Sequence, residues 1–363
     1  MQNTQNLLSI SHLKKEFPSA ANSLFRKKGG AVCANDDINL DIRRGETFGL
    51  VGESGCGKST FGRTVLQLYK PTSGSVKYYG RTQEELPPSA GGEWLQEGGV
   101  ELTKLSPQAL RTLRRDLQIV FQDPYSSLNP RMTVGQIIAE GAVTHGFYPK
   151  GSAELRAYVE KVMTDCGLQP YMSGRYPHQF SGGQRQRVCI ARALAVKPKF
   201  VVCDECVSAL DVSVQSQILN LLTELKEKEG LTYLFISHDL SVVRRISDRI
   251  AVMYLGKIVE QGSAEEIFDN PLHPYTIALI SAIPSVYRKR GEGERILLDG
   301  QASKPTQGCP FYPRCFMGTE YCQRVPVPLE EVEKGHFAAC HFASVPAKEK
   351  RAKAKANGKT VRA

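Results

Sequence analysis

The residues with the clearest chemistry lie between positions 52 and 59. They read Gly52, Glu53, Ser54, Gly55, Cys56, Gly57, Lys58 and Ser59, with Thr60 next, and fit G-x-x-x-x-G-K-[ST]. Glycines let backbone N–H groups turn toward phosphate oxygens, and a following helix directs its positive end at them. In this pattern the lysine neutralises β- and γ-phosphate charge, and the Ser59 hydroxyl ligates Mg²⁺. A plain glycine turn is the alternative. We favour a nucleotide site because an apolar strand precedes this phosphate loop (residues 52–59) and a helical stretch follows it.

Two neighbouring carboxylates, Asp204 and Glu205, follow the apolar stretch 200–203. At the end of a buried strand, Asp204 can hold a Mg²⁺-bound water, and Glu205 can polarise an attacking water. Two acids at the start of a loop are common, so the acid pair alone is weak evidence. Together with the upstream phosphate loop it predicts hydrolysis of a nucleoside triphosphate.

A third segment offers a second place for an anion. This signature segment consists of Phe180, Ser181, Gly182, Gly183 and Gln184, and it opens a predicted helix. An ordinary helix cap is the alternative. One nucleotide does not need two cradles in one chain, so we expect two chains to pair head-to-tail. Each nucleotide would then lie between one chain's phosphate loop and the other chain's Ser-Gly-Gly.

These segments need a framework of strands and helices to hold them. Apolar patterning predicts strands at 7–10, 38–42, 47–51, 117–121, 200–203 and 231–237, and helices at 59–68, 133–168 with a break near 149–151, 182–196 and 213–229. The alternation of strands and helices predicts an α/β fold with a substantially parallel sheet. Residues 79–99, which include Trp94, are predicted to form a surface insertion.

Length and composition limit the class of protein. The chain has 363 residues, of which 41% are hydrophobic and 23% charged, as in ordinary globular proteins. We expect a cytosolic protein, because no apolar run approaches the ~18 residues of a membrane span and the start lacks the order of a secretion signal. Much of the net charge of +10 comes from residues 347–363, with seven basic residues and one acidic residue. We expect this basic tail to be disordered; contact with anionic lipid or RNA is the alternative.

The order of the motifs resembles that of the ATP-binding subunit of an ABC transporter, over about residues 5–345. Further matches are Gln122 after a strand, His238 after another, and the run Ser208, Ala209, Leu210 and Asp211. The resemblance implies a P-loop ABC ATPase fold with a mixed sheet and a helical subdomain. It also implies that Gln122 senses Mg²⁺ and the membrane partner, that Asp211 communicates across a dimer, and that His238 contacts the γ-phosphate.

Residues 121–130, 208–215 and 270–276 are similar to the oligopeptide/dipeptide importer branch. Members usually import peptides, and relatives move nickel or glutathione. A soluble ABC ATPase of repair or translation is the rival, but the long coiled coil or tandem halves of that class are not visible. Cys206 stands where the family commonly has proline, and Phe180 where it commonly has leucine. Phe25 is the nearest candidate for stacking on adenine.

The resemblance also implies partners. We expect a second ABC ATPase subunit, with a heterodimer favoured over a homodimer, and two membrane permease subunits. An extracytoplasmic solute-binding protein would act indirectly, and no nucleic acid is expected. The chain would then sit peripherally at the cytoplasmic face of the plasma membrane, held by the permease.

Four cysteines form a dense group near the C-terminus: Cys309, Cys315, Cys322 and Cys340. Clustered thiols in the cytosol suggest a metal rather than disulfides, although the spacing is not that of common zinc ribbons. The group resembles the C-terminal cysteine motif of peptide-importer ATPases, which implies a [4Fe–4S] cluster with four Cys ligands. Zinc, with His336 or His341 as further ligands, is the second reading, and reduced structural thiols are the third.

These observations predict three parts. Residues 1–285 would form the ATPase domain, with the helical subdomain at about 125–195. Residues 286–345 would form a small cysteine-rich C-terminal domain, and 346–363 the tail.

Overall fold

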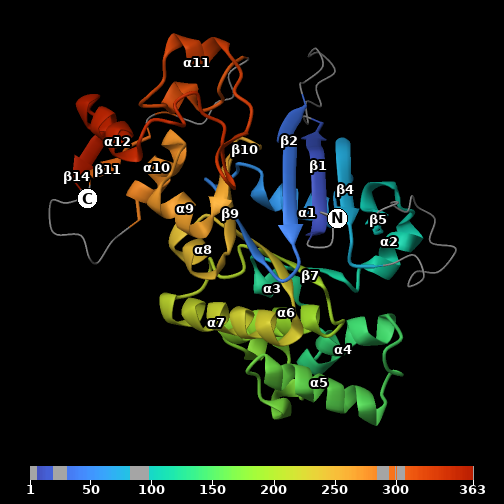
Figure 1. Ribbon diagram of the computed structural model, residues 1–363. Coiled ribbons are helices and arrows are strands. Elements are labelled where there is room, and N and C mark those ends of the chain that lie inside the picture. Colours follow the sequence, from blue (N-terminus) through green and yellow to red (C-terminus); the bar gives the residue numbers. More distant parts are fainter. Residues whose placement is uncertain are drawn as a thin grey trace, which may run out of the picture. The chain divides into compact units, whose positions relative to one another are not determined.

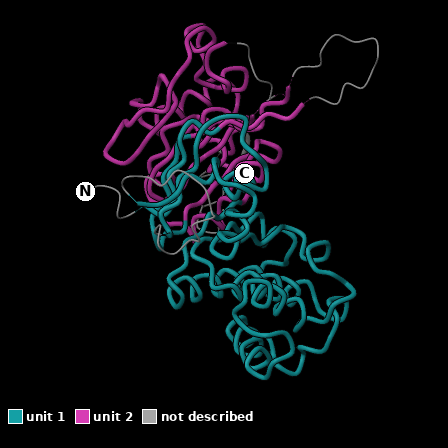
Figure 2. Tube along the Cα trace, turned by 90° about the vertical axis from the view of Figure 1, so that its right-hand side faces the viewer, with its two compact units in different colours: residues 1–13, 39–47, 62–236 teal, residues 14–38, 48–61, 237–363 magenta. Residues whose placement is uncertain are grey.

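The computed structural model describes residues 6–18, 31–81, 98–283, 294–298, 300 and 307–362. It divides into two compact units whose sequences are interleaved (Figure 2): residues 1–13, 39–47 and 62–236 form unit 1, and residues 14–38, 48–61 and 237–363 form unit 2. Two long strands, β1 (Asn6–Phe17) and β2 (Val32–Arg43), contribute residues to both units. Phe25, Trp94 and most of the predicted insertion lie outside the described residues.

The sheet of unit 1 contains three parallel strands in the order β6 (Leu117–Val120), β7 (Phe200–Asp204) and β8 (Thr232–Ser237). All residues of β7 and β8 are buried, as expected for parallel strands covered on both faces. A second sheet includes β4 (Ser73–Tyr78), which pairs antiparallel with β5 (Val100–Glu101). The predicted strands at 117–121, 200–203 and 231–237 therefore form, with the acid pair at the end of the central one.

Helices make up most of the rest of unit 1. In chain order they are the end of α1 (Lys58–Val65), η3 (Leu102–Lys104), α2 (Pro107–Leu113), α3 (Pro124–Ser127), α4 (Val134–Thr144), α5 (Ala153–Asp165), η4 (Pro170–Gly174), η5 (Pro177–Gln179), α6 (Gly182–Leu194) and α7 (Val212–Glu229). α4 packs against α5 and α6, and α6 also packs against α7 (Figure 1). The predicted break in 133–168 separates α4 from α5. Gly146 and Gly151 there adopt left-handed φ angles of 71° and 80°.

The sheet of unit 2 is mixed. β3 (Thr47–Val51) runs parallel to β9 (Arg249–Tyr254), which pairs antiparallel with β10 (Lys257–Ser263). Beyond β10 follow β13 (His336–Ala338) and β12 (Glu330–Glu333), both antiparallel to their neighbours. Three helices follow in this unit: α8 (Leu240–Ile246), α9 (Ala264–Asp269) and α10 (Pro274–Ser281).

The expected separate cysteine-rich domain at 286–345 is not supported. Its described residues belong to unit 2 and include η6 (Tyr312–Arg314) and α11 (Glu320–Arg324). β13 extends the sheet through β10, and the fully buried Phe311 ring lies 5.2 Å from Tyr254 and 5.4 Å from Tyr275. The physical reason is that this segment has few aliphatic residues. It is stabilised by the sheet and aromatic side chains of the unit rather than by a core of its own.

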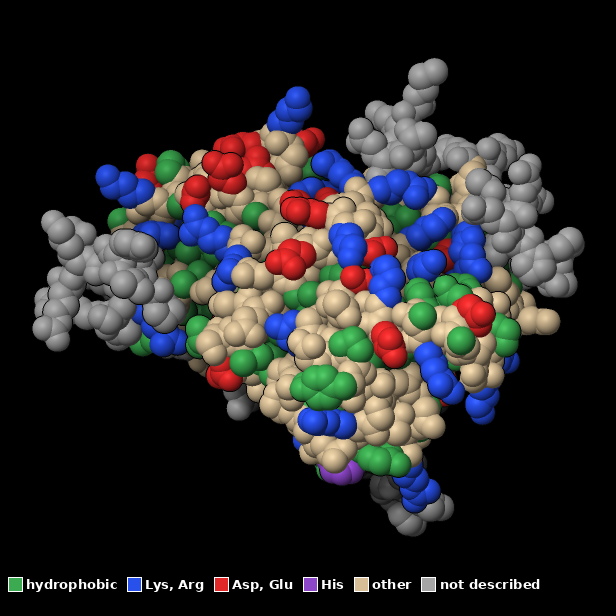
Figure 3. Space-filling model, turned by 90° about the horizontal axis from the view of Figure 1, so that it is seen from below, with side chains coloured by type: hydrophobic (Ala, Val, Ile, Leu, Met, Phe, Trp, Pro, Cys, Tyr) green, Lys and Arg blue, Asp and Glu red, His purple; other side chains and the backbone are tan. Residues whose placement is uncertain are grey.

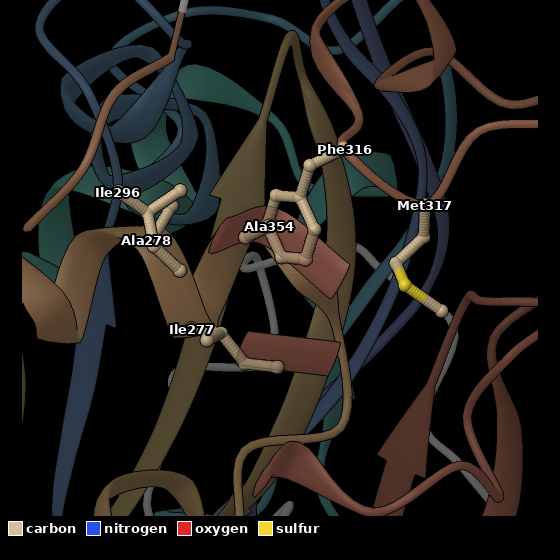
Figure 4. Close-up of a cluster of buried hydrophobic side chains, with 6 residues drawn as sticks. All are labelled: Ile277, Ala278, Ile296, Phe316, Met317 and Ala354. Atoms are coloured by element: carbon tan, nitrogen blue, oxygen red, sulfur yellow. The ribbon is translucent and has the colours of Figure 1, made fainter. Parts of the chain in front are cut away.

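The basic tail is folded, which corrects the expectation of disorder. It forms α12 (Ala347–Ala356) and β14 (Thr360–Arg362), and β14 pairs with β11 (Glu294–Ile296). Figure 4 shows the apolar cluster that receives it: Ile277, Ala278, Ile296, Phe316, Met317 and Ala354. Lys350, one helical turn before Ala354, is also buried, and its Nζ donates to the carbonyls of Leu272 (2.6 Å) and Ala343 (3.2 Å). The net charge of the tail gave no indication of this packing, because a charge count does not record that residues four positions apart, such as Lys350 and Ala354, lie on the same face of a helix.

The surface shows no single sign of charge on the face drawn in Figure 3, where basic and acidic side chains are interspersed. Among the described helices, none has the length and apolarity that crossing a bilayer requires.

Candidate nucleotide-binding site

The phosphate loop lies in unit 2, between β3 and α1, which begins at Lys58. Gly57 has φ +110°, and a Cβ there would lie 2.2 Å from the carbonyl oxygen of Ala34. Gly52 has φ +156°, and a Cβ there would lie 2.2 Å from the carbonyl oxygen of Met253. Both positions therefore require glycine because other backbone segments approach closely. The arrangement matches the predicted order of strand, glycine loop and helix.

Lys58 is folded back over this loop. Its Nζ donates to the carbonyl oxygens of Gly52 (2.7 Å) and Glu53 (2.9 Å), and the residue is only 4% exposed. The ammonium group is thus held at the loop by partners that phosphate oxygens can replace. Burial raises the pKa of the neighbouring Cys56 thiol, so that side chain is neutral near pH 7.

Glu53 is held at two points by residues that the sequence motifs did not single out for this role. Its carboxylate forms a two-pronged ion pair with Arg314, and its backbone N–H donates to the Tyr275 hydroxyl. Tyr275 lies within 270–276, a segment used above only to assign the branch. No local pattern around Arg314 indicated its contact.

The acid pair lies in unit 1, at the end of β7. Asp204 is buried, and Arg63 Nη2 lies 3.4 Å from its Oδ2. Glu205 is half-buried and adopts a left-handed φ of 50°, which is uncommon outside glycine. Its N–H donates to the carbonyl of Ile236 (3.0 Å), and its own carbonyl accepts from the N–H and Oγ of Ser208 (3.1 and 2.9 Å). This turn fixes the backbone of Glu205 although Cys206 replaces the family's proline.

The signature segment also lies in unit 1, where it forms a helix cap. Ser181 Oγ accepts from the N–H of Gln184 (3.3 Å), and Gln184 Oε1 accepts from the N–H of Ser181 (3.0 Å). Phe180 is buried, whereas Ser181 and Gly182 are exposed at the start of the 13-residue α6. Packing explains the glycine at position 183, because a Cβ there would lie 2.4 Å from Val214. The structure thus shows the cap that the alternative interpretation required.

The remaining predicted residues lie at the ends of elements. Gln122 is exposed between β6 and α3, and His238 is exposed between β8 and α8. Asp211 caps α7 by accepting from the N–H of Val214 (2.9 Å), and this bond lowers the pKa of its carboxyl. Gln122, the acid pair, the signature segment and residues 208–211 all belong to unit 1, whereas the phosphate loop and His238 belong to unit 2.

The four C-terminal cysteines come together in unit 2. Each thiol is close enough to the other three to interact with them electrostatically. Burial raises the pKa of Cys309, that of Cys315 to about 12 and that of Cys340 to about 11. Among the described residues, however, no group of three or more Cys, His, Asp or Glu side chains is arranged to hold a metal ion.

The two histidines of the zinc reading have other partners. His336 Nε2 lies 2.9 Å from the buried Glu260 carboxylate, and His341 Nε2 lies 3.1 Å from the carbonyl of Val325. These contacts weigh against zinc ligation by either ring.

Comparison with known proteins identifies the class. Residues 35–208 match the family model described as ABC transporter, and residues 259–322 match that described as oligopeptide/dipeptide transporter, C-terminal region. The chain is therefore an ABC-type ATPase, and it belongs to the oligopeptide/dipeptide transport ATP-binding proteins of the ABC transporter family.

Two curated relatives come from Bacillus subtilis strain 168. The chain is 47% identical over 348 residues to the oligopeptide transport ATP-binding protein AppF, covering 94% of this chain and 99% of that protein. It is 50% identical over 281 residues to the oligopeptide transport ATP-binding protein OppF, covering 77% and 83%.

Solved structures show the same fold. One is the dimeric post-hydrolysis state of the ATP-binding cassette MJ0796 bound to ADP and Pi, with a TM-score of 0.58, 26% identity, and coverage of 71% of this chain and 98% of that one. Another is cbiO1 from Clostridium perfringens, part of the ABC transporter complex cbiONQ, with a TM-score of 0.57, 27% identity, and coverage of 73% and 91%.

Proposed function

We propose that this chain hydrolyses MgATP to energise the import of di- or oligopeptides. The observation that carries the proposal is the 47% identity to an oligopeptide transport ATP-binding protein across 94% of this chain and 99% of that relative. Importers of nickel or glutathione are the alternative within the same family.

We infer the following roles at the nucleotide. The phosphate loop and Thr60 bind the phosphates, with Lys58 as the main charge partner. Mg²⁺ is held by Ser59, by Gln122 and, through water, by Asp204. Glu205 polarises the attacking water, and His238 contacts the γ-phosphate. What supports these roles is the family, the rigid turn that holds Glu205, and the Arg63 guanidinium that keeps Asp204 oriented.

We also propose that the chain works as a head-to-tail dimer in which the signature segment meets the partner's ATP. Support comes from the exposed Ser181 and Gly182 at the start of a 13-residue helix, whose N–H groups and dipole suit an anion. Residues 208–211 would then lie near the dimer interface. A heterodimer with a second ABC ATPase subunit is favoured, and a homodimer is the alternative.

A groove in unit 1 suits a helix of the permease subunits. It has a volume of about 730 Å³ between α4, α5 and η4. Apolar residues along it include Met132, Val143, Leu155 and Val159. Apolar grooves of this kind receive amphipathic helices. Docking there would hold the chain at the cytoplasmic face of the membrane, with an extracytoplasmic solute-binding protein on the other side.

Transport assays test the proposed solute. Cells lacking the gene are complemented with the wild-type chain or with Glu205→Gln, and uptake of a labelled oligopeptide, nickel and glutathione is compared. We expect the wild-type chain alone to restore peptide uptake. Restored uptake of nickel or glutathione without peptide uptake would mean that the chain energises the import of that solute instead. A chain that purifies without membrane subunits and restores no uptake would favour the soluble ATPase.

We propose separately that Cys309, Cys315, Cys322 and Cys340 hold a [4Fe–4S] cluster, with zinc as the alternative. The support is the convergence of four thiols, two buried and two half-buried, in an ATPase of this family. Because the described side chains are not arranged as ligands, binding requires the thiols to deprotonate and reorient. A bound cluster would supply four bonds that tie this loop-rich segment together.

Metal analysis of anaerobically purified protein tests this proposal. We expect about four irons per chain and broad absorption near ~400 nm. Cys322→Ser should lose the iron, whereas Cys33→Ser, a change outside the group, should retain it. A colourless protein with stoichiometric zinc would show that the bound metal is zinc rather than iron. Metal-free protein with four titratable thiols would exclude both metals.

A further inference from the structure

The Glu53 side chain presents an electrostatic problem for a phosphate site. It belongs to the loop that wraps the phosphates, and its carboxylate has the same sign of charge as ATP. Like charges disfavour one another by an amount that grows as water is excluded. An unpaired Glu53 would therefore oppose nucleotide binding. The consequence depends on the proposed nucleotide site, on which this inference rests.

Arg314 addresses this problem directly. Its Nη1 lies 2.7 Å from Glu53 Oε2, and its Nη2 lies 3.0 Å from Oε1. The Arg314 side chain is 9% exposed and that of Glu53 is 35% exposed, so the pair is partly shielded from solvent. A two-pronged guanidinium–carboxylate pair fixes direction as well as charge. The carboxylate is thereby neutralised and held in one orientation.

The surroundings hold Arg314 in place before any nucleotide arrives. It ends the short η6 turn, and the neighbouring Phe311 is fully buried against Tyr254 and Tyr275. The guanidinium carbon also lies 5.9 Å from the centre of the Tyr254 ring. Little side-chain freedom remains to be lost, so the arginine can act as a fixed support.

Tyr275 completes the support through the backbone. Its hydroxyl accepts the Glu53 N–H at 2.9 Å, while the Glu53 carbonyl accepts from Lys58 Nζ at 2.9 Å. Side chain, N–H and carbonyl of one loop residue are thus all engaged. Two of these three partners come from residues more than 200 positions away in the chain.

We propose that Arg314 is a positioning residue for the phosphate loop: it neutralises Glu53 and, together with Tyr275, fixes the loop backbone for MgATP. The C-terminal segment that carries it therefore sets nucleotide affinity in addition to any role of its cysteines.

Equilibrium titration with a fluorescent ATP analogue and Mg²⁺ tests the proposal on the full chain. Arg314→Ala should raise the Kd about tenfold, the range expected when one partner of a partly buried charge pair is removed. Arg324→Ala is the matched control, because Arg324 pairs with Glu320 on the same segment but the two side chains are 75% and 82% exposed. The control should bind as the wild type does.

A second substitution separates electrostatics from general damage. Glu53→Gln in the Arg314→Ala background should restore the Kd to within about threefold of wild type, because it removes the unpaired carboxylate. A merely structural role for Arg314 predicts no rescue. Tyr275→Phe should weaken binding about threefold by removing one hydrogen bond.

The outcomes are distinct. Wild-type affinity in Arg314→Ala would overturn the proposal, as would a weakened double variant with no rescue. If Arg314→Ala does not fold, Arg314→Gln takes its place, and wild-type affinity of that variant would likewise overturn the proposal. A wild-type chain that binds no MgATP would instead refute the proposed nucleotide site.

Discussion

The phosphate loop and the signature segment are both glycine-containing turns that open a helix, yet their surroundings differ. In the phosphate loop, Lys58 and Glu53 have buried or partly buried partners within unit 2. Among the described residues, the Ser181 and Gln184 side chains of the signature segment bond only to each other's backbone, and Ser181 and Gly182 face solvent. One segment is supported by its own fold, whereas the other only starts a helix. This difference is what the proposed head-to-tail dimer requires, in which the chain would build one half of each site and expose the other half to a partner.

The largest effect should come from Glu205. Glu205→Gln should lower the rate of ATP hydrolysis by about 10²- to 10⁴-fold, the usual contribution of a general base, and leave MgATP affinity nearly unchanged. Phosphate release and nucleotide titration measure the two quantities. Glu224→Gln, an exposed change on α7, is the control. A Glu205→Gln complex that turns over at the wild-type rate would remove this residue from the mechanism.

Lys58 tests the phosphate loop, whose partners lie within its own unit. Lys58→Ala should weaken MgATP binding by about 100-fold, because it removes a charge partner of the phosphates. The loss should be seen in the isolated chain, before any partner is added. Equal affinity of the variant and the wild type would contradict the assignment of Lys58.

Ser181 tests the signature segment, which is exposed to solvent. Ser181→Asn keeps an N-cap side chain and so preserves the helix start, while placing extra bulk on the exposed anion-binding face. We expect unchanged MgATP affinity in the isolated chain but roughly tenfold weaker ATP-dependent dimerisation. Analytical ultracentrifugation with trapped ATP measures the dimer. Unimpaired dimerisation would mean that the signature segment is a helix cap and nothing more.

The smallest effect concerns the support of the phosphate loop. His273 Nδ1 accepts the N–H of Tyr275, and burial lowers the pKa of His273 to about 3. Because this pKa lies below the unfolded value of about 6.5, the unfolded chain binds a proton that the native chain excludes. Stability is therefore lost as pH falls below about 6.5, by about 1 kcal/mol between pH 7 and 5.5. Denaturant unfolding of His273→Asn, which keeps a capping side chain, should lack this part of the pH dependence. An unchanged dependence of the unfolding free energy on pH in this variant would mean that other titratable groups cause it.

Sequence reasoning recovered what is local. The phosphate loop, the acid pair and the strands around them follow from runs of a few residues, and the structure places them where those runs predict. The contacts that support the sites did not follow, because they join distant positions: Arg63 with Asp204, and Arg314 with Glu53. No periodicity records such pairs. The tail was missed for another reason, since its charges concealed the one face that packs.

That packed face has a consequence for proteolysis. The last seventeen residues contain seven potential trypsin sites, and a disordered tail would be cut at all of them. Lys350 is buried against carbonyl oxygens, so cleavage after it must wait for local opening of α12. Slow trimming at this position would report how firmly the C-terminal segment, and with it the support of the phosphate loop, stays closed.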